Sequence, residues 1–261
     1  MTYDLITLGR VGVDLYPQQT GVGLAEVRTF AKYLGGSATN VAVAAARHGL
    51  RSAVVTGVGD DPLGGFVRDA LRGFGVDDRH VVTVPGALAG RDPGTDTVLD
   101  LDWRPMFWDR AEDAPARYAQ ALEHATVAVG NRDEVEVAVG TRDPDRAADL
   151  LLARGVRLAV VKQGPHGVLA RTATEDVRVP PIPVEVVNGL GAGDAFGGAL
   201  VAGLLAGLPL ADTLAAANAA GALVASRHAC ADAMPTPDEI AELTGRPTPR
   251  AVATTTTGEP R

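Results

Sequence analysis

Cysteine, aromatic residues and long apolar runs are all scarce in this chain of 261 residues. Its single cysteine, Cys230, cannot form an internal disulfide, so we expect a small buried apolar residue and a reducing cytoplasm. No apolar run is long enough to cross a bilayer, and the N-terminal residues lack the pattern of a signal peptide. These absences predict a soluble cytoplasmic protein.

Basic residues are also fewer than acidic ones, with 24 Lys and Arg against 32 Asp and Glu. The formal net charge of -8 at pH 7 argues against nucleic acid and anionic membranes as partners. Aromatic residues make up 4% of the chain, whereas hydrophobic residues as a whole make up 46%. This composition and length predict one full core, with helices rich in Ala, Val and Gly packed closely on a sheet.

Strand and helix patterns alternate along the chain. We expect strands at residues 5–8, 52–56, 81–84, 98–102, 126–129 and 157–162, and a hairpin-like passage over 164–179. The expected helices cover residues 38–48, 62–75, 114–124, 133–139, 145–154, 195–206 and 210–226, with a short one after Pro237. This alternation predicts a parallel sheet covered on both faces, followed by a disordered tail at 247–261.

The segment from Asn188 to Phe196, Asn-Gly-Leu-Gly-Ala-Gly-Asp-Ala-Phe, is the most informative one. It follows an apolar run at 184–187, so we expect a strand, a glycine turn and a helix. Glycines and a helix N-terminus can hold a phosphoryl group, and Asp194 beside it could deprotonate an attacking hydroxyl. The alternative, given equal weight, is a tight turn in which Asp194 caps the helix.

Two commoner phosphate motifs are excluded at this segment. No Gly-Lys-Ser/Thr follows the glycines, so it is not a Walker A loop. Asp194 and Phe196 stand where the dinucleotide fingerprint continues toward its third glycine, and no such fingerprint follows an early strand. The sequence therefore gives no support to a nicotinamide dehydrogenase.

A second glycine cluster, Gly35-Gly36, precedes the helix that contains Asn40. Two glycines let a small polar ligand lie against the backbone, and the Asn40 amide offers both a donor and an acceptor. We expect Asp14 to end the first strand, where a carboxylate can hold a polyol. The alternatives are a simple turn for the glycines and a surface charge for Asp14.

The two glycine clusters, in this order and spacing, resemble the two signatures of the ribokinase-like (PfkB) sugar kinases. The resemblance covers the chain to about Leu243 and implies a three-layer α/β/α sandwich with a mostly parallel central sheet. It implies one kinase domain over residues 1–246. Where relatives carry lid strands and a further core strand and helix, this chain has a short Pro/Gly linker at 85–97. We therefore expect the small β lid to be largely absent and the central sheet to be interrupted.

The resemblance also implies roles for individual residues. Asp194 would be the catalytic base, and the N–H groups of Gly191, Ala192 and Gly193 would stabilise the transferring phosphoryl group. Substrate hydroxyls would be held by Asp14, Gly35, Gly36 and Asn40. ATP would be bordered by Lys162, Gly164 and Asn218, and Mg²⁺ would be organised by Glu134 with Asn131 of an N-x-x-E motif.

Three stretches are similar to those of the family members that phosphorylate 5-dehydro-2-deoxy-D-gluconate, a sugar acid of myo-inositol catabolism. They are residues 12–17, 99–108 and 187–194. Arg104 would bind the carboxylate of that acid. The alternative is that Arg104 is a solvated surface arginine without a role in binding. Asn188-Gly189-Leu190 replaces the Asp-Thr-Thr of many relatives, so no potassium site is predicted.

Several alternatives stay open from the sequence. One is a kinase for 2-dehydro-3-deoxygluconate or fructose. Another is a non-catalytic nucleotide-binding relic that has lost its lid. The oligomeric state is also open, because the missing strands would remove the usual dimer surface of the family.

Overall fold

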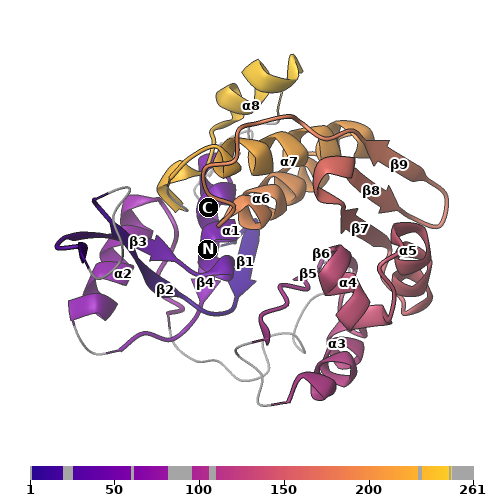
Figure 1. Cartoon of the computed structure of the whole chain (residues 1–261), viewed down its shortest axis with the longest axis horizontal. Helices are drawn as coiled ribbons and strands as arrows, with labels where there is room; N and C mark the ends of the chain where they lie inside the picture. Colours follow the sequence, from indigo (N-terminus) through magenta and orange to yellow (C-terminus); the bar gives the residue numbers. More distant parts are fainter. Residues whose placement is uncertain are drawn as a thin grey trace, which may run out of the picture. The chain divides into compact units, whose positions relative to one another are not determined.

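The computed structural model describes residues 2–19, 26–59, 62–81, 96–105, 110–228, 231–246 and 248. Cys230, most of the linker and the tail beyond Thr248 lie outside these residues, as does most of the strand expected at 81–84. The chain forms two compact units, Met1–Thr83 with Val184–Arg261, and Val84–Pro183 (Figure 1). No sheet of the described residues joins the two units, and the single domain expected over residues 1–246 stays a prediction.

The first unit contains two small sheets. Strand β1 (Leu5–Leu8) pairs in parallel with β4 (Ser52–Val55), within a residue of the expected bounds. Strand β2 (Gly12–Pro17) pairs antiparallel with β3 (Phe30–Gly35), and the rings of Tyr16 and Tyr33 meet edge to face across this ribbon. The expected strands did not include this ribbon, because its partly exposed residues lack a sustained apolar pattern.

The described residues of the first unit include five helices: α1 (Ser37–Arg47), α2 (Pro62–Gly73), α6 (Ala192–Leu205), α7 (Leu210–Ala225) and α8 (Pro237–Thr244). Helix α6 packs along both α7 and α1. A Cβ atom at Gly198 would lie 2.4 Å from the Cβ of Ala44, so glycine is needed for this approach of α6 to α1. Small residues thus set the distance between the two helices that carry the glycine motifs.

The strand expected at 184–187 is wrong. These residues belong to no strand, and the side chains of Val186 and Val187 are 68% and 46% exposed. The backbone N–H groups of Val187 and Asn188 both donate to the carbonyl of Ala225, at 2.9 and 3.0 Å. The segment is therefore tied to the end of α7, and this tertiary contact overrides the β propensity of valine.

The second unit is built on one mixed sheet. Its strand order is β5 (Val98–Asp100), β6 (Val127–Asn131), β7 (Leu158–Lys162), β8 (Val168–Arg171) and β9 (Asp176–Val179). The first three strands are parallel, and β8 and β9 form the expected hairpin. In the described residues β1 and β4 bond only with each other. The interruption of the central sheet stays a prediction.

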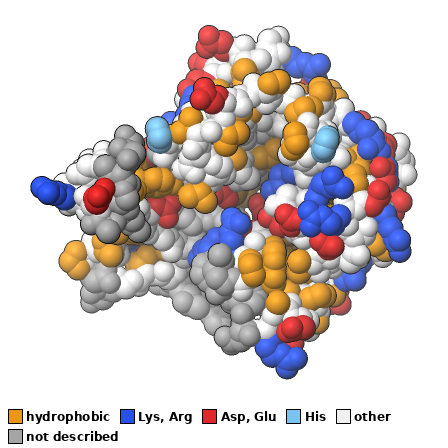
Figure 2. Space-filling view, viewed as in Figure 1, with side chains coloured by type: hydrophobic (Ala, Val, Ile, Leu, Met, Phe, Trp, Pro, Cys, Tyr) orange, Lys and Arg blue, Asp and Glu red, His pale blue; other side chains and the backbone are white. Residues whose placement is uncertain are grey.

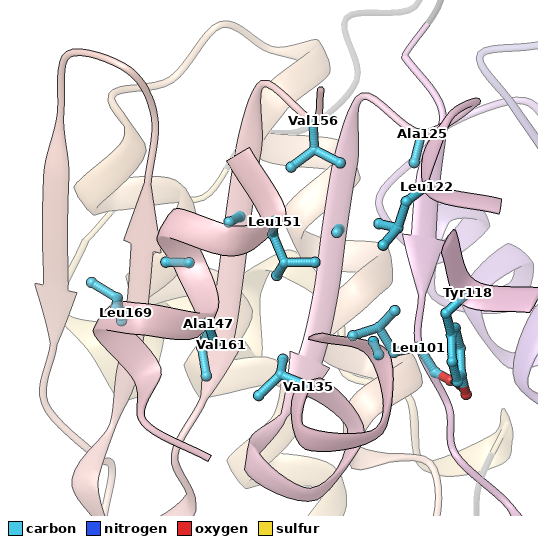
Figure 3. Close-up of a cluster of buried hydrophobic side chains, with 14 of the residues drawn as sticks. Leu101, Tyr118, Leu122, Ala125, Val135, Ala147, Leu151, Val156, Val161 and Leu169 are labelled. Carbon is cyan, nitrogen blue, oxygen red and sulfur yellow. Dashed lines mark hydrogen bonds between the residues drawn. The ribbon is translucent and has the colours of Figure 1, made fainter. Parts of the chain in front are cut away.

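Three helices cover one face of this sheet: α3 (Ala114–Leu122), α4 (Arg132–Val139) and α5 (Pro144–Ala153). Figure 3 shows their inward side chains, Leu122, Val135 and Leu151 among them, packed over the strands. Short 3-10 turns occur at Ala111–Asp113, Gly164–His166 and, in the first unit, Ala231–Ala233. The expected bounds of these helices agree with the structure to within two residues.

The surface of the second unit carries a network of paired charges. Arg171 contacts the carboxylates of Asp145, Asp149 and Asp176, and Arg178 contacts Asp145 as well. In Figure 2, basic and acidic side chains accordingly lie side by side near β8, β9 and α5. None of the described helices is both long enough and apolar enough to cross a membrane.

Candidate active site

Asp14 lies against a glycine in the β2–β3 ribbon. The prediction that it ends the first strand is wrong: β1 stops at Leu8, and Asp14 sits within β2, opposite Tyr33. A Cβ atom at Gly35 would be 2.5 Å from the Asp14 carboxyl carbon. Only glycine leaves room for the carboxylate there, so the ribbon fixes Asp14 beside the start of α1.

The next residue, Gly36, turns the chain into helix α1. Its φ of 100° lies in the region that favours glycine, and a Cβ there would be 2.5 Å from the carbonyl oxygen of Arg10. The Gly36 carbonyl accepts the first helical hydrogen bond, from the backbone N–H of Asn40, at 2.9 Å. Gly35-Gly36 is thus a conformational requirement, and it places Asn40 one turn into the helix.

The glycine turn before α6 has the geometry of a helix start. Gly191 has a φ of 81° and its carbonyl accepts from the N–H of Ala195 at 2.9 Å. Ala192, Gly193 and Asp194 form the first turn, where backbone N–H groups have no partner within the helix. The Asp194 side chain is 9% exposed, so it is more deeply placed than a solvated helix cap.

Helix α7 borders the same turn. Gly221 of α7 lies close to the carbonyl of Ala192, because a Cβ atom added to it would be 3.0 Å from that oxygen. Asn218 is half-buried and stands one helical turn before Gly221, on the same side of α7. The residue predicted to border ATP in this unit therefore lies on the helix face that meets the glycine turn.

The two glycine motifs meet through their polar side chains. The amide nitrogen Nδ2 of Asn40 donates to Oδ2 of Asp194 at 2.7 Å, and both side chains are buried. The residues are 154 positions apart. Sequence reasoning assigned a role to each residue but missed this contact, for which the chain carries no local signal.

In the second unit, the N-x-x-E motif forms a reciprocal cap on α4. The side-chain oxygen of Asn131 accepts from the N–H groups of Asp133 and Glu134, at 2.9 and 3.0 Å. In return, Oε2 of Glu134 accepts from the N–H of Asn131 at 2.6 Å. The Asn131 oxygen is thus engaged by the backbone, and its part in holding a metal stays a prediction. Glu134 is held at the end of β6.

Lys162 and Asp100 lie near Glu134 at the ends of neighbouring strands. The Lys162 ammonium is 4.0 Å from a carboxylate oxygen of each acidic residue. Burial raises the pKa of Glu134 above its usual range, and the charge of Lys162 opposes part of that rise. No role was assigned to Asp100 from the sequence, although its position at the end of a parallel strand could have indicated a site residue.

Two further features adjoin this cluster. The Tyr118 hydroxyl donates to the carbonyl of Leu101, and burial, with Glu134 nearby, raises its pKa to about 12, so the phenol stays protonated. Arg104 is partly exposed and pairs with Asp102 at 2.9 Å. Asp102 has a φ of 28°, which is unusual for a residue with a side chain and is typical of functional segments.

The donor set of the second unit fits a metal that is shared with a nucleotide. No three His, Cys, Asp or Glu side chains gather as a metal site within the described ranges. Mg²⁺ in phosphoryl-transfer enzymes commonly takes one or two carboxylates, with water and phosphate oxygens completing its shell. Glu134, with Asp100 close to the same lysine, meets that requirement. Gly164, after β7, has a φ of 57° that favours glycine.

Comparison with solved structures defines the class of fold. An apo putative ribokinase II from E. coli matches with a TM-score of 0.81 and 22% identity, over 92% of this chain and 98% of that one. Aminoimidazole riboside kinase from Salmonella enterica, complexed with aminoimidazole riboside and an ATP analog, matches at 0.79 and 23%, over 92% and 99%. The fold is ribokinase-like, as the glycine motifs predicted.

A family profile described as "pfkB family carbohydrate kinase" matches residues 3–92 and 88–237. The chain therefore belongs to the PfkB family, and it is a carbohydrate kinase. It is 27% identical to 5-dehydro-2-deoxygluconokinase of Geobacillus thermodenitrificans (strain NG80-2), over 92% of each chain. The enzyme of that name from Clostridium tetani (strain Massachusetts / E88) is 25% identical, again over 92% of each.

The alignments are interrupted within this chain. The two profile matches meet inside the linker, because one ends at residue 92 and the other begins at residue 88. The Geobacillus alignment spans 311 residues, whereas 92% of these 261 residues is about 240, so about 70 aligned positions have no counterpart here. The break in the match coincides with the short Pro/Gly linker at 85–97.

Proposed function

We propose that this kinase transfers the γ-phosphoryl group of ATP to the primary hydroxyl of a sugar acid, 5-dehydro-2-deoxy-D-gluconate. The observation that carries the proposal is the buried carboxylate of Asp194 in the first turn of α6, directly after the left-handed Gly191. A helix start attracts a phosphoryl group, and a carboxylate beside it serves a hydroxyl that attacks that group. The names of the relatives support the substrate.

In the proposed reaction, the substrate hydroxyl gives its proton to Asp194 while its oxygen bonds to the γ-phosphorus. The bond from that phosphorus to the β,γ-bridging oxygen breaks, and ADP leaves. The N–H groups of Gly191 to Gly193 stabilise the charge on the transferring group. Asp14, placed against Gly35, holds hydroxyls of the sugar, together with the backbone of Gly36.

The second unit is proposed to hold the nucleotide and its metal. Lys162 and Gly164 are proposed to border ATP on this unit, and the same role is proposed for Asn218 within the first unit. Glu134 organises Mg²⁺, which neutralises phosphate charge when it is bound. The putative ribokinase II of E. coli has been solved in complex with ATP and Mg²⁺, which supports this cofactor pair for the family.

Arg104 is proposed to select an acid over a neutral sugar. Its guanidinium is partly exposed and is steadied by Asp102, so it can still present donors to a carboxylate. A neutral sugar carries no negative charge with which this guanidinium could pair. The location proposed for the enzyme is the cytoplasm, where ATP and sugar acids are available.

A substrate panel tests the function. Purified protein with MgATP and 5-dehydro-2-deoxy-D-gluconate, 2-dehydro-3-deoxygluconate or fructose should release ADP fastest with the first acid, as measured by a coupled assay.

Arg104→Ala should raise KM for that acid by about 10-fold or more with a smaller change in kcat, since one charge-assisted contact is lost. Arg117→Ala, an exposed arginine of α3, is the matched control. A preference for fructose, or an unaltered KM in Arg104→Ala, would contradict the assignment.

A second candidate is a nucleotide-binding relic without transfer activity. The observation that favours it is that about 70 aligned positions (92% of 261 residues, about 240, against 311) have no counterpart in this chain, whose profile match is divided at the linker. Calorimetry that shows ATP binding, together with no phosphate transfer to any acid of the panel, would select this candidate over the kinase.

A further inference from the structure

Asn40 is proposed to hold a substrate hydroxyl, and it also contacts the proposed base, Asp194. Its side chain is 3% exposed, and its Nδ2 is 2.7 Å from Oδ2 of Asp194. An ionised carboxylate can only accept hydrogen bonds, so the nitrogen of the amide, and not its oxygen, must face Asp194. The orientation of the amide therefore follows from chemistry.

Both partners of this hydrogen bond stand on rigid elements. The backbone N–H of Asn40 is already engaged by Gly36 in the first turn of α1. Helices α1 and α6 are in close contact at Gly198 against Ala44, and a Cβ at Gly197 would be 3.4 Å from Val41. The backbones that carry the amide and the carboxylate are therefore held at a fixed separation, and burial of both side chains limits the space around them.

We infer that Asn40 is a positioning residue for the base Asp194, a role that rests on the proposed function and goes beyond holding a substrate hydroxyl. Its amide fixes the rotation of the carboxylate and so the direction from which a hydroxyl can reach it. A hydrogen bond donated to the charged form also keeps the carboxylate ionised and ready to accept a proton.

The other end of the same amide points to a ligand. Oδ1 of Asn40 is buried and has no hydrogen-bond partner among the residues that the structure describes. A buried acceptor without a partner costs free energy, and a substrate hydroxyl is a donor of suitable size to satisfy it. Asn40 would then join the substrate to the base, with one amide group serving both.

The elements packed against Asp194 carry a small set of charged side chains in the described part of the chain. Asp194 is the only titratable side chain of α6. Helix α1 contributes Arg47 in its last turn, and α7 contributes Asp212 in its first turn, paired with Arg246. Arg10 and Asp14 belong to the segments that pack on Gly35-Gly36. These groups are the same in the wild type and in the Asn40 variants, so a difference between their titrations of Asp194 reports on the substitution at position 40.

The pH profile of kcat/KM tests the role. Asn40→Asp places two carboxylates in contact, so one of them titrates at higher pH and the acidic limb should move up by about one unit or more. Asn40→Ala removes the donor to the charged form, which should move the limb up by less and lower kcat by about 10-fold or more. Thr39→Val, at a buried neighbour whose hydroxyl has no partner in the described structure, should leave the limb in place.

The outcomes separate this inference from the proposed function. An active wild type whose acidic limb stays fixed in both Asn40 variants, with only KM raised, would overturn the positioning role and leave the kinase intact. A wild type without transfer activity would refute the function, and the inference is then tested by ¹³C NMR titration of the Asp194 carboxyl carbon, assigned with Asp194→Asn. An unchanged carboxyl pKa in folded Asn40→Ala and Asn40→Asp would overturn it.

Discussion

At the scale of single residues, the two glycine clusters are constrained by space and backbone conformation. Gly36 and Gly191 have φ angles of 100° and 81°, which a residue with a side chain rarely adopts. Gly35 is required for another reason, because Asp14 occupies the position of its missing Cβ. These positions therefore place Asp14, Asn40 and Asp194.

Asp194→Asn separates the two interpretations of this carboxylate. If Asp194 is the base, the change should lower kcat by about 10²- to 10⁴-fold, as is usual for loss of general-base catalysis, while ATP binding stays close to that of the wild type. Steady-state assays and calorimetry measure the two quantities.

Asp212→Asn is the matched control, since Asp212 also stands in the first turn of a helix, α7. Both variants remove a charge near a helix N-terminus, so each loses a similar favourable interaction with the helix dipole. Equal, slight losses of kcat in the two variants would show that Asp194 is a helix cap only.

At the scale of elements, the contact between α1 and α6 decides the geometry of the first unit's site. It brings Asn40 to Asp194 by means of residues without bulky side chains, among them Ala44 and Gly198. Interiors are packed too closely to absorb an added group without a shift of the surrounding backbone. The precision of the site thus depends on residues that do not touch a substrate.

Gly198→Ala should be costly for this reason. The new Cβ would lie 2.4 Å from that of Ala44, so the helices must separate. Overpacking of this kind costs about 1–3 kcal/mol, which outweighs the roughly 0.5–1 kcal/mol that alanine gains over glycine within a helix. Urea denaturation should therefore show a lower free energy of unfolding, accompanied by a lower kcat.

For Gly65→Ala in α2 we predict the opposite change in the free energy of unfolding. Beyond its chain neighbours and its own helix backbone, no atom of the described residues lies within 4 Å of the Cβ it would add, and the position is exposed. The free energy of unfolding should rise by about 0.5–1 kcal/mol through helix propensity alone. If both variants were equally stable, the contact of α6 with α1 would not be as tight as the structure shows.

At the scale of the whole molecule, the linker distinguishes this chain from its relatives. The profile matches meet between residues 88 and 92, and about 70 aligned positions (311 less about 240, which is 92% of 261) have no counterpart. We proposed from the sequence that the missing positions are lid strands and a core strand with its helix. A lid keeps water away from the transferring phosphoryl group. Its loss should therefore increase the share of phosphoryl groups that are transferred to water instead of to the sugar.

Uncoupled ATP hydrolysis measures that effect. This kinase should hydrolyse more ATP per sugar phosphorylated than the Geobacillus enzyme under the same conditions. A chimera that carries the extra segment of that enzyme between residues 88 and 92 should reduce the ratio. The prediction fails if the two natural enzymes couple ATP use to sugar phosphorylation equally well.

Much of this protein follows from local sequence. Apolar runs such as 52–55 and 158–161 are buried strands in the structure, and the alanine-rich segments are helices at nearly the expected residues. The glycine turn with Asp194 and the pair Gly35-Gly36 indicated the family, because strained backbone positions leave a local trace in the sequence.

Other features were decided by tertiary structure alone. Valines at 184–187 predicted a strand, yet no partner strand is present in the described residues and the end of α7 binds their backbone instead. The contacts of Asn40 with Asp194 and of Lys162 with Asp100 join residues from different elements. Pairing between distant residues depends on how helices and strands pack, which no local pattern encodes. The sequence by itself determined the chemical groups of the site, and the packing of helices and strands decided which of them meet.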